Sequence, residues 1–210
     1  EAKIVLVGIT PGFTQLKNSF VEAQKQLKMG SNDEATLIAV KKTGAFSGSM
    51  RPNLVAMLDH LKISDRLRSS GADELFGKSN HLVHTTSILR YPVFVDGENY
   101  NGSPNMTKHP MLQQQIRDHF AKEVEKLKNA VFIPLGPKVS EGLLWMAKKN
   151  LIDSAKVLNG MPHPSGANAE RIAYFLGKKK RSDLSVKTDP NKLDALKDEL
   201  IKKISRLSTL

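Results

Sequence analysis

Apolar residues along the chain fall into two patterns, short continuous runs and longer stretches with helical spacing. The run at residues 4–7 is rich in β-branched residues, which is typical of a strand covered on both faces. Residues 13–27 carry Phe20, Ala23 and Leu27 on one side of a predicted helix. The chain therefore begins with a strand followed by a helix.

The same alternation continues along the sequence. Short apolar runs occupy residues 36–40, 82–89 and 130–135. Helical spacing recurs at residues 53–61, 112–128 and 139–147. Strands that alternate with helices predict an α/β fold with a central, largely parallel sheet flanked by helices. At 210 residues the natural expectation is a single domain over residues 1–210.

Two further segments stand out. Residues 91–109 are rich in Pro, Gly and Asn and predict a long loop, either functional or disordered. Asp189 and Pro190 are typical of a helix start, and the apolar stripe after them predicts an amphipathic helix over residues 189–207. That stripe packs on the domain or forms a dimer contact. We expect the former, and hence a monomer.

Composition narrows the partners. The chain has 32 Lys and Arg against 21 Asp and Glu, a net charge of +11, which favours a polyanion such as nucleic acid over a merely solubilising surface. There is no Cys, and therefore no disulfide framework or thiolate metal site. No apolar run is long enough to span a membrane and no signal peptide is visible, so we expect a cytoplasmic protein. No metal or other cofactor is assigned.

Two short motifs carry the candidate chemistry. The first strand runs into the turn Gly8-Ile9-Thr10-Pro11-Gly12, and ligands of α/β sheets bind beyond the carboxyl ends of strands. The second motif, His163-Pro164-Ser165-Gly166-Ala167-Asn168, lies near the other end of the chain. Taken alone, the first motif is an ordinary strand-to-helix turn.

Together and in this order, the two motifs resemble the active-site loops of the uracil-DNA glycosylase superfamily, most closely its mismatch-specific and single-strand-selective branches. Three intervening segments are also similar to that family: Gly44-Ala45-Phe46-Ser47, Arg51-Pro52-Asn53-Leu54 and the strand around Thr86. The resemblance covers most of residues 3–177. It implies a three-layer α/β/α fold with a central four-stranded, mainly parallel sheet, and DNA as the partner.

The resemblance also implies roles for individual residues. Enzymes of this family extrude the target base into a pocket. His163 would stabilise the charge on the departing base. Thr10 occupies the position of the family residue that places the attacking water. The base would be held by four residues, with Phe46 stacking on it: Ile9, Gly12, Phe46 and Thr86. Phe46 as a plain core residue and His163 as a packing residue are the alternatives.

The expected DNA contacts lie on both sides of the second motif. Asn53, Ser165, Gly166 and Asn168 offer donors to phosphates. Arg171 follows on a predicted helix, and the basic run Lys178, Lys179 and Lys180 comes shortly after. We interpret this run as a backbone-binding cluster, with a solvated face as the alternative.

Three departures from the family pattern concern the pocket. Thr10 replaces the Asp or Asn that positions water, and Asp96 and Glu98 are candidate helpers. Thr86 replaces a base-reading Asn. Gly12 replaces a Tyr that blocks substituents on C5 of the base. The changes predict a roomier pocket, suited to a C5-substituted pyrimidine such as a modified cytosine of viral DNA.

The sequence thus predicts a monofunctional DNA glycosylase without a cofactor, acting in DNA repair or antiviral defence. Two alternatives remain open. One is a glycosylase fold that only binds or senses DNA, which Thr10 favours. The other is a different nucleotide-handling α/β protein, although the chain lacks the phosphate-loop and dinucleotide patterns.

Overall fold

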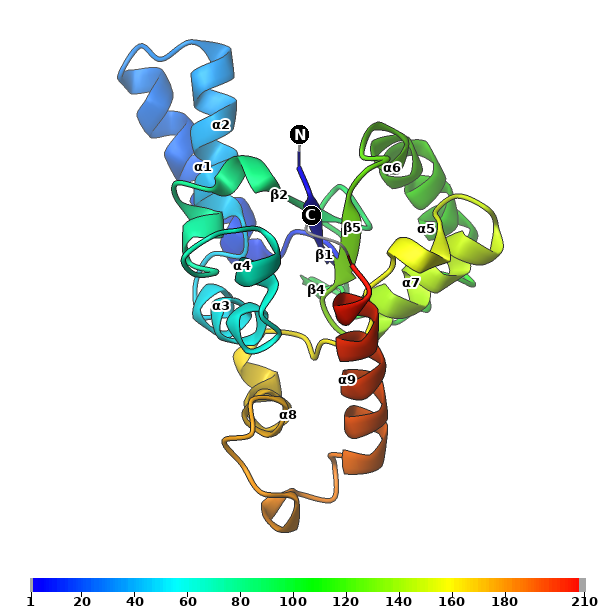
Figure 1. Ribbon diagram of the computed structural model, residues 1–210. Helices are drawn as coiled ribbons and strands as arrows, with labels where there is room; N and C mark the ends of the chain where they lie inside the picture. The colour runs from blue at the N-terminus through cyan, green and yellow to red at the C-terminus, as the bar shows by residue number, and fades with distance from the viewer. Residues whose placement is uncertain (1, 208–210) are drawn as a thin grey trace.

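The computed structural model describes residues 2–207 and shows an α/β fold built on a parallel sheet. Strands β1 (Ile4–Gly8), β2 (Val83–Ser87) and β5 (Val131–Pro134) lie in the order β2-β1-β5, with helices on both sides (Figure 1). All three strands are parallel. The prediction of an α/β protein with a parallel central sheet is confirmed.

Beside β5, one further segment adds to the sheet. Val157 forms a single parallel bridge with Phe132, and the amide of Leu158 donates to the carbonyl of Phe132 at 2.8 Å. Within residues 2–207 the main sheet thus has three full strands and one isolated bridge, where the sequence predicts four strands.

Alternate residues of β1 divide the core into two halves, because successive side chains of a strand point to opposite faces. Ile4 and Leu6 face a cluster that includes residues of α3 (Met50–His60), α4 (Ile63–Arg66), α8 (Ala169–Phe175) and α9 (Pro190–Ser205). Val5 and Val7 face α5 (Pro110–Gln115), α6 (Lys122–Lys126) and α7 (Pro137–Lys148). All four β1 side chains are fully buried.

The apolar run at residues 36–40 lies in a helix and not in a strand. It belongs to α2 (Asp33–Gly44), which Asn32 caps by accepting from the amide of Ala35. This helix pairs with α1 (Phe13–Lys28) in a hairpin that projects from the domain (Figure 1). Leu37 and Ile38 are 68% and 58% exposed, so the run is not the buried edge of a sheet. A short apolar run carries no period that separates a strand from a helix.

The other predicted helices form with small changes of boundary. The stretch at 112–128 is a continuous helical segment in which α5 and α6 flank a π-helical turn, Ile116–Ala121. The predicted helices at 53–61 and 139–147 correspond to α3 and α7, the latter with proline in its first turn. Five single 3-10 turns complete the helical elements of the described chain: Glu74–Phe76, Asn80–Leu82, Ser154–Lys156, Gly166–Asn168 and Arg181–Asp183.

The segment at residues 91–109 is a loop, as predicted, but it carries a small antiparallel ribbon. Strand β3 (Phe94–Val95) pairs with β4 (Glu98–Asn99). Tyr100 is buried, and its hydroxyl donates to the carbonyl of Pro104. The loop is thus anchored to the domain by its own contacts.

The C-terminal helix α9 packs on the domain through its apolar stripe. Leu200 and Ile204 are buried in the same half of the core as Ile4 and Leu6, and Leu207 lies against that cluster. Asp189 caps the helix by accepting from the amide of Lys192 at 3.2 Å. Among residues 2–207, no helix is both long and apolar enough to cross a membrane.

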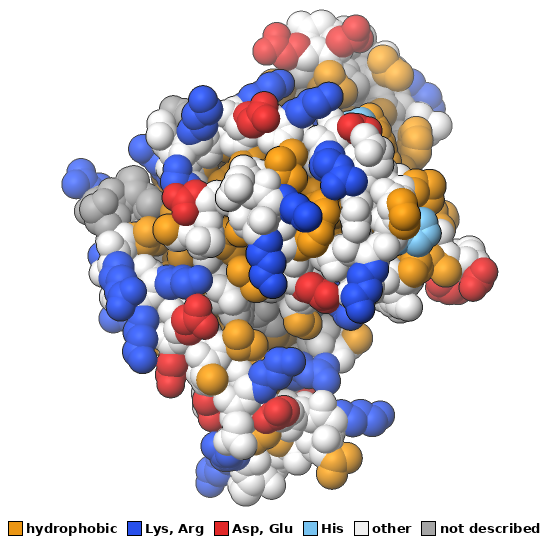
Figure 2. Space-filling model, turned by 90° about the vertical axis from the view of Figure 1, so that its right-hand side faces the viewer, with side chains coloured by type: hydrophobic (Ala, Val, Ile, Leu, Met, Phe, Trp, Pro, Cys, Tyr) orange, Lys and Arg blue, Asp and Glu red, His pale blue; other side chains and the backbone are white. Residues whose placement is uncertain are grey.

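The positive charge is spread over one face of the molecule. Figure 2 shows Lys and Arg side chains distributed over one face of the molecule, with apolar patches exposed between them. The overall excess of positive charge therefore does not, on this face, form one continuous patch.

Gly160 provides a test of how the segment after Val157 is held against α9. Its φ is +131°, and a Cβ there would come within 2.5 Å of the backbone oxygen of Leu196. We predict that Gly160→Ala lowers the free energy of unfolding by about 1–3 kcal/mol or more, through strain and overpacking. Urea unfolding measures the change. Gly166→Ala is the matched control, because a Cβ at Gly166 meets no atom within 4 Å. Equal stability of the two variants would contradict the close contact.

Candidate functional site

The candidate site lies where the carboxyl ends of the three parallel strands meet. The amide of Leu135, just after β5, donates to Val7 at 2.9 Å, and the amide of Ile88, just after β2, donates to Gly8 at 2.9 Å. The loops that follow β1, β2 and β5 are therefore brought together at one edge of the sheet. In open α/β sheets, this is the edge where ligands bind.

Phe46 lies directly over the end of β1. Its Cε1 atom is 3.2 Å from the position that a Cβ on Gly8 would occupy, so this approach requires glycine or a shift of the ring. Phe46 has a φ of +48° and is only partly buried. A bulky residue in this strained backbone region is uncommon, and such residues cluster at functional sites. The structure thus places an aromatic ring at the edge where the sequence predicts a base-stacking residue.

His163 lies at the same edge, against the turn that follows β5. Its Cβ is 2.8 Å from the position of a Cβ on Gly136. The Nδ1 atom of His163 accepts from the amide of Ser165 at 3.3 Å, and burial lowers the pKa of the imidazole. The ring is therefore neutral at pH 7. Because Nδ1 accepts, the proton is on Nε2, which makes Nε2 a hydrogen-bond donor.

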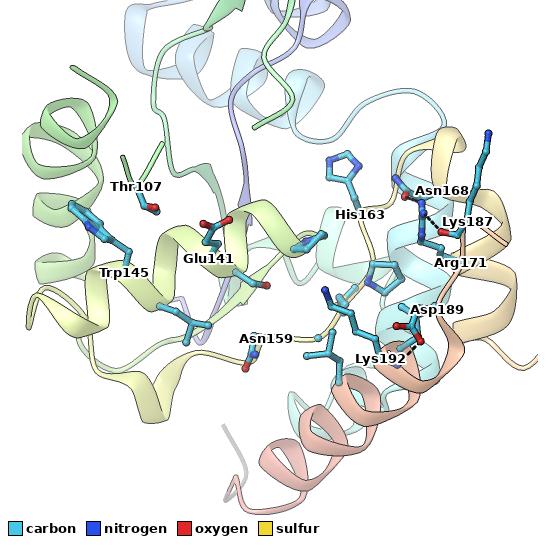
Figure 3. A pocket seen from close by; sticks show the side chains of 18 of the residues that line it. Thr107, Glu141, Trp145, Asn159, His163, Asn168, Arg171, Lys187, Asp189 and Lys192 are labelled. Atoms are coloured by element: carbon cyan, nitrogen blue, oxygen red, sulfur yellow. Dashed lines mark hydrogen bonds between the residues drawn. The ribbon is translucent and has the colours of Figure 1, made fainter. Parts of the chain in front are cut away.

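The second motif is tied to the start of α3 and to the segment before α9. The side-chain amide of Asn53 donates to the carbonyl of Pro164 at 2.9 Å. Asn168 donates to the hydroxyl of Ser165 at 3.1 Å and accepts from Arg171 at 2.9 Å. Arg171 in turn donates to the carbonyl of Lys187, in the segment before α9, at 2.9 Å. Figure 3 shows Asn168 and Arg171 close together on the side of the loop that carries His163. These side chains brace the loop, whereas Gly166 is exposed.

In the first motif, Thr10 anchors the long loop. Its hydroxyl donates to the carbonyl of Tyr91 at 2.8 Å and accepts from the amide of Val93 at 3.0 Å. One lone pair of the hydroxyl is left for a water molecule. Ile9 packs against the half of the core that contains Val5 and Val7. A Cβ on Gly12 would come within 2.7 Å of Oε1 of Gln15, so a polar side chain borders the space beside this glycine.

Thr86 lies on the other face of the sheet from Phe46. It pairs with Val7 in the strand register, and its hydroxyl donates to Oε2 of Glu123 at 2.8 Å. The neighbouring Ser87 pairs with Gly8, and its hydroxyl is 3.4 Å from the position of a Cβ on Gly8. Ser87 is therefore the β2 side chain beside Phe46. The two-residue period of the strand would have shown that Thr86 and Ser87 face opposite sides.

Glu123 joins several polar groups on the side of β2 that carries Thr86. His84 Nε2 is 2.6 Å from its Oε1, and Arg90 lies at 3.6 Å from the same oxygen. Lys41 Nζ lies 3.2 Å from His84 Nδ1. Burial alone would raise the pKa of Glu123, but the hydrogen bonds from His84 and Thr86 outweigh it and the pKa is lowered. The ionised carboxylate thus holds α6 to the edge strand.

The basic run has two kinds of lysine. Lys179 forms an ion pair with Glu170 at 2.9 Å, and this carboxylate also accepts from Thr188 and Ser185. The hydrogen bond from Thr188, followed by those from Ser185 and Lys179, holds the pKa of Glu170 well below its usual range. Lys178 and Lys180 are exposed and form no ion pair with any other described residue. They are the members of the run that are available to phosphates.

A groove of about 830 Å³ begins at His163 and runs between α7 and α9. Figure 3 shows His163, Asn168 and Arg171 on one side of it and Trp145 and Thr107 on the other. The sequence indicated His163, Asn168 and Arg171, but not the residues of α7. Those residues carry no motif, and they meet the second motif only through the fold.

Comparison with known proteins gives one clear relative. The uncharacterized protein YoxB of Bacillus subtilis (strain 168) is 35% identical over 190 residues, which cover 90% of this chain and 74% of YoxB. The chain belongs to the YoxB family. No protein-family model matches the chain, and no solved structure matches it.

The Glu123 contacts predict a pH-dependent contribution to stability. Glu123→Gln should lower the free energy of unfolding at pH 7 by about 1–3 kcal/mol, because the ionised acceptor is lost. The folded state lowers the pKa of Glu123 below its ordinary value of 4.5. The difference between wild type and variant is therefore full above pH 4.5 and shrinks as the pH falls through the folded-state value.

Denaturant unfolding at pH 7 and below pH 4.5 measures both effects. Glu125→Gln is the matched control, since Glu125 is an exposed residue of the same helix. A pH-independent difference, or an equal loss in the control, would contradict the role of Glu123.

Proposed function

We propose that this protein is a monofunctional DNA glycosylase of the uracil-DNA glycosylase type. The observation that carries the proposal is His163, a neutral histidine whose Nε2 carries the proton, at the sheet edge where Phe46 covers Gly8. The order of the motifs supports the same assignment. The Val157 bridge beside β5 fits the fourth strand of that fold.

In the proposed reaction, the target nucleotide leaves the helix and its base stacks on Phe46. The bond between the base nitrogen and C1′ of the deoxyribose breaks, and its electron pair goes to the base. The Nε2–H group of His163 stabilises the negative charge on the base oxygen. Water attacks C1′ and loses a proton to solvent, and the base anion takes up a proton from solvent, which leaves an abasic site and the free base.

Thr10 holds water and does not act as a base. The hydroxyl hydrogen of Thr10 is hydrogen-bonded to the carbonyl of Tyr91, and one lone pair accepts from the amide of Val93. A water molecule can therefore donate only to the remaining lone pair. A threonine hydroxyl is too weak a base to take a proton from water at neutral pH. Rate enhancement therefore rests mainly on stabilisation of the departing base by His163.

The proposed substrate is a C5-substituted pyrimidine. Gly12 carries no side chain, and the nearest atoms to a Cβ there belong to Gln15 and Asn99, whose side chains can move. The hydroxyl of Thr86 donates to Glu123, so position 86 has no side-chain amide that could form the hydrogen bonds specific for uracil. Ser87, beside Gly8, offers one hydroxyl to the base in its place.

The second candidate function is a DNA-binding or sensing protein without catalysis. The observation that favours it is the engagement of Thr10 by Tyr91 and Val93, which leaves a weak site for the attacking water. Base release separates the two functions, because a sensor binds altered DNA and leaves its glycosidic bonds intact.

The test of catalysis is His163→Ala. The protein is incubated with single-stranded oligonucleotides that carry uracil or a C5-substituted pyrimidine, and alkali-labile sites are measured. We expect release of the C5-substituted base, slowed about 10²-fold or more in the variant by the loss of one donor to the developing charge. DNA affinity should change little, because His163 contacts the base and not the phosphates.

His81→Ala is the control, since His81 is exposed and lies outside this edge of the sheet. If the folded wild-type protein binds DNA but releases no base from any substrate, the protein is a DNA sensor and not a glycosylase. Efficient release of uracil alone would overturn the C5 assignment.

The charge predicts a salt-dependent affinity for DNA. Each phosphate contact releases counterions, so the logarithm of affinity should fall steeply with the logarithm of salt concentration. Replacing Lys178 and Lys180 with Ala should reduce the slope by about one to two. Lys179→Ala should instead lower stability, because Lys179 pairs with Glu170. Fluorescence anisotropy of a labelled strand measures the slopes, and a salt-independent affinity would contradict DNA as the partner.

A further inference from the structure

The groove beside His163 combines an apolar floor with a charged rim. Leu144, Trp145, Leu193 and Leu196 contribute apolar surface from α7 and α9. Met161 and Pro162, just before His163, lie at the floor and are buried. The groove is therefore continuous with the candidate site and extends away from it across the molecule.

The rim of the groove is positively charged. Lys148, Arg171, Lys187 and Lys192 contribute four positive charges, and Glu141 and Asp189 contribute two negative ones, which leaves +2. Both carboxylates are engaged: Glu141 accepts from Asn105 at 2.7 Å, and Asp189 caps α9. Apart from Arg171, these cations are exposed, so their charges are available to an anion.

One aromatic side chain lies at the end of the groove opposite to His163. Trp145 is the single tryptophan of the chain and is partly exposed. Arg117 lies 5.6 Å from its ring centre. An apolar ring flanked by cations suits a nucleic-acid base, because every base has a face that can stack and each is followed by a phosphate.

The geometry points to the groove as the binding track for the single strand next to the target nucleotide. This inference rests on the proposed function, and it adds the substrate class: DNA that is unpaired on one side of the target. Phosphates lie along Lys187 and Lys192, and an unstacked base packs against Trp145. A volume of about 830 Å³ accommodates one or two nucleotides. A duplex keeps its base faces stacked and presents only their edges.

The single tryptophan makes the groove directly observable. Wild-type protein is titrated with an unlabelled oligodeoxycytidylate strand, whose bases carry no C5 substituent, while Trp145 fluorescence is followed. Anisotropy of a labelled strand of the same sequence is measured in parallel. We expect the fluorescence to change and to saturate with the same affinity as the anisotropy. Deoxycytidine monophosphate and a fully paired duplex should give a much weaker change.

Variants locate the contacts. Trp145→Ala should weaken binding of the oligodeoxycytidylate about tenfold, and Trp145→Phe should retain most of the affinity by keeping an aromatic face. The double replacement of Lys187 and Lys192 by Ala should weaken binding severalfold. The double replacement of Lys17 and Lys28 by Ala is the matched control, since both are exposed on α1 and the net charge change is the same. Melting temperatures establish that each variant is folded.

The results separate the groove from the proposed function. Strand binding by anisotropy without a change in Trp145 fluorescence overturns the groove and leaves the glycosylase intact. An equal fluorescence change with deoxycytidine monophosphate or with the duplex overturns the single-strand assignment. An equal loss in the α1 control shows that only overall charge matters and also overturns it. Failure of the glycosylase is seen separately, as absence of His163-dependent base release.

Discussion

The burial of β1 on both faces and between two parallel neighbours is the constraint on which the site depends. Its apolar side chains separate the two halves of the core, and its backbone pairs with β2 on one side and β5 on the other. Because the pairing is parallel, the loops after all three strands open at one edge. A shift of register by one residue would send the apolar side chains of β1 to the wrong halves of the core.

Around this edge, loops are held by polar side chains and not by regular structure. Asn53 fixes the turn after His163 to α3, and Thr10 fixes the long loop to the end of β1. Glu170 gathers Lys179, Ser185 and Thr188 in the segment between α8 and α9. Such contacts act between residues far apart in the chain. They make the edge a defined surface although most of its residues lie in loops.

Two carboxylates hold some of the basic residues in contacts within the fold. Glu123 engages His84 and Arg90 on the side of the sheet away from Phe46, and Glu170 engages Lys179. These contacts stabilise the fold. The lysines of the groove rim are exposed, and so are Lys178 and Lys180. The charge available to a polyanion therefore depends on which cations the fold leaves without a partner.

The sequence by itself determined the elements whose patterns are long or strongly apolar: β1, β5, α1, α3, α7 and the stripe of α9. It also placed the first motif after a strand, because the apolar run and the turn that ends it are local properties. Positions 36–40 were ambiguous for the same reason. A run of five residues is too short to have a period. In the fold it lies in α2, which pairs with α1, and Leu37 and Ile38 remain exposed.

Tertiary structure alone decided which side chains meet. It set Thr86 against Glu123 and Ser87 beside Gly8, since the face of a strand residue depends on the register with its neighbour. It joined α7 to the motif of His163 in one groove, because helices distant in sequence pack wherever the core closes. It also fixed the tautomer of His163 through the amide of Ser165. The sequence specifies the chemistry of each side chain, whereas the packing of the fold determines its contact partners and its orientation.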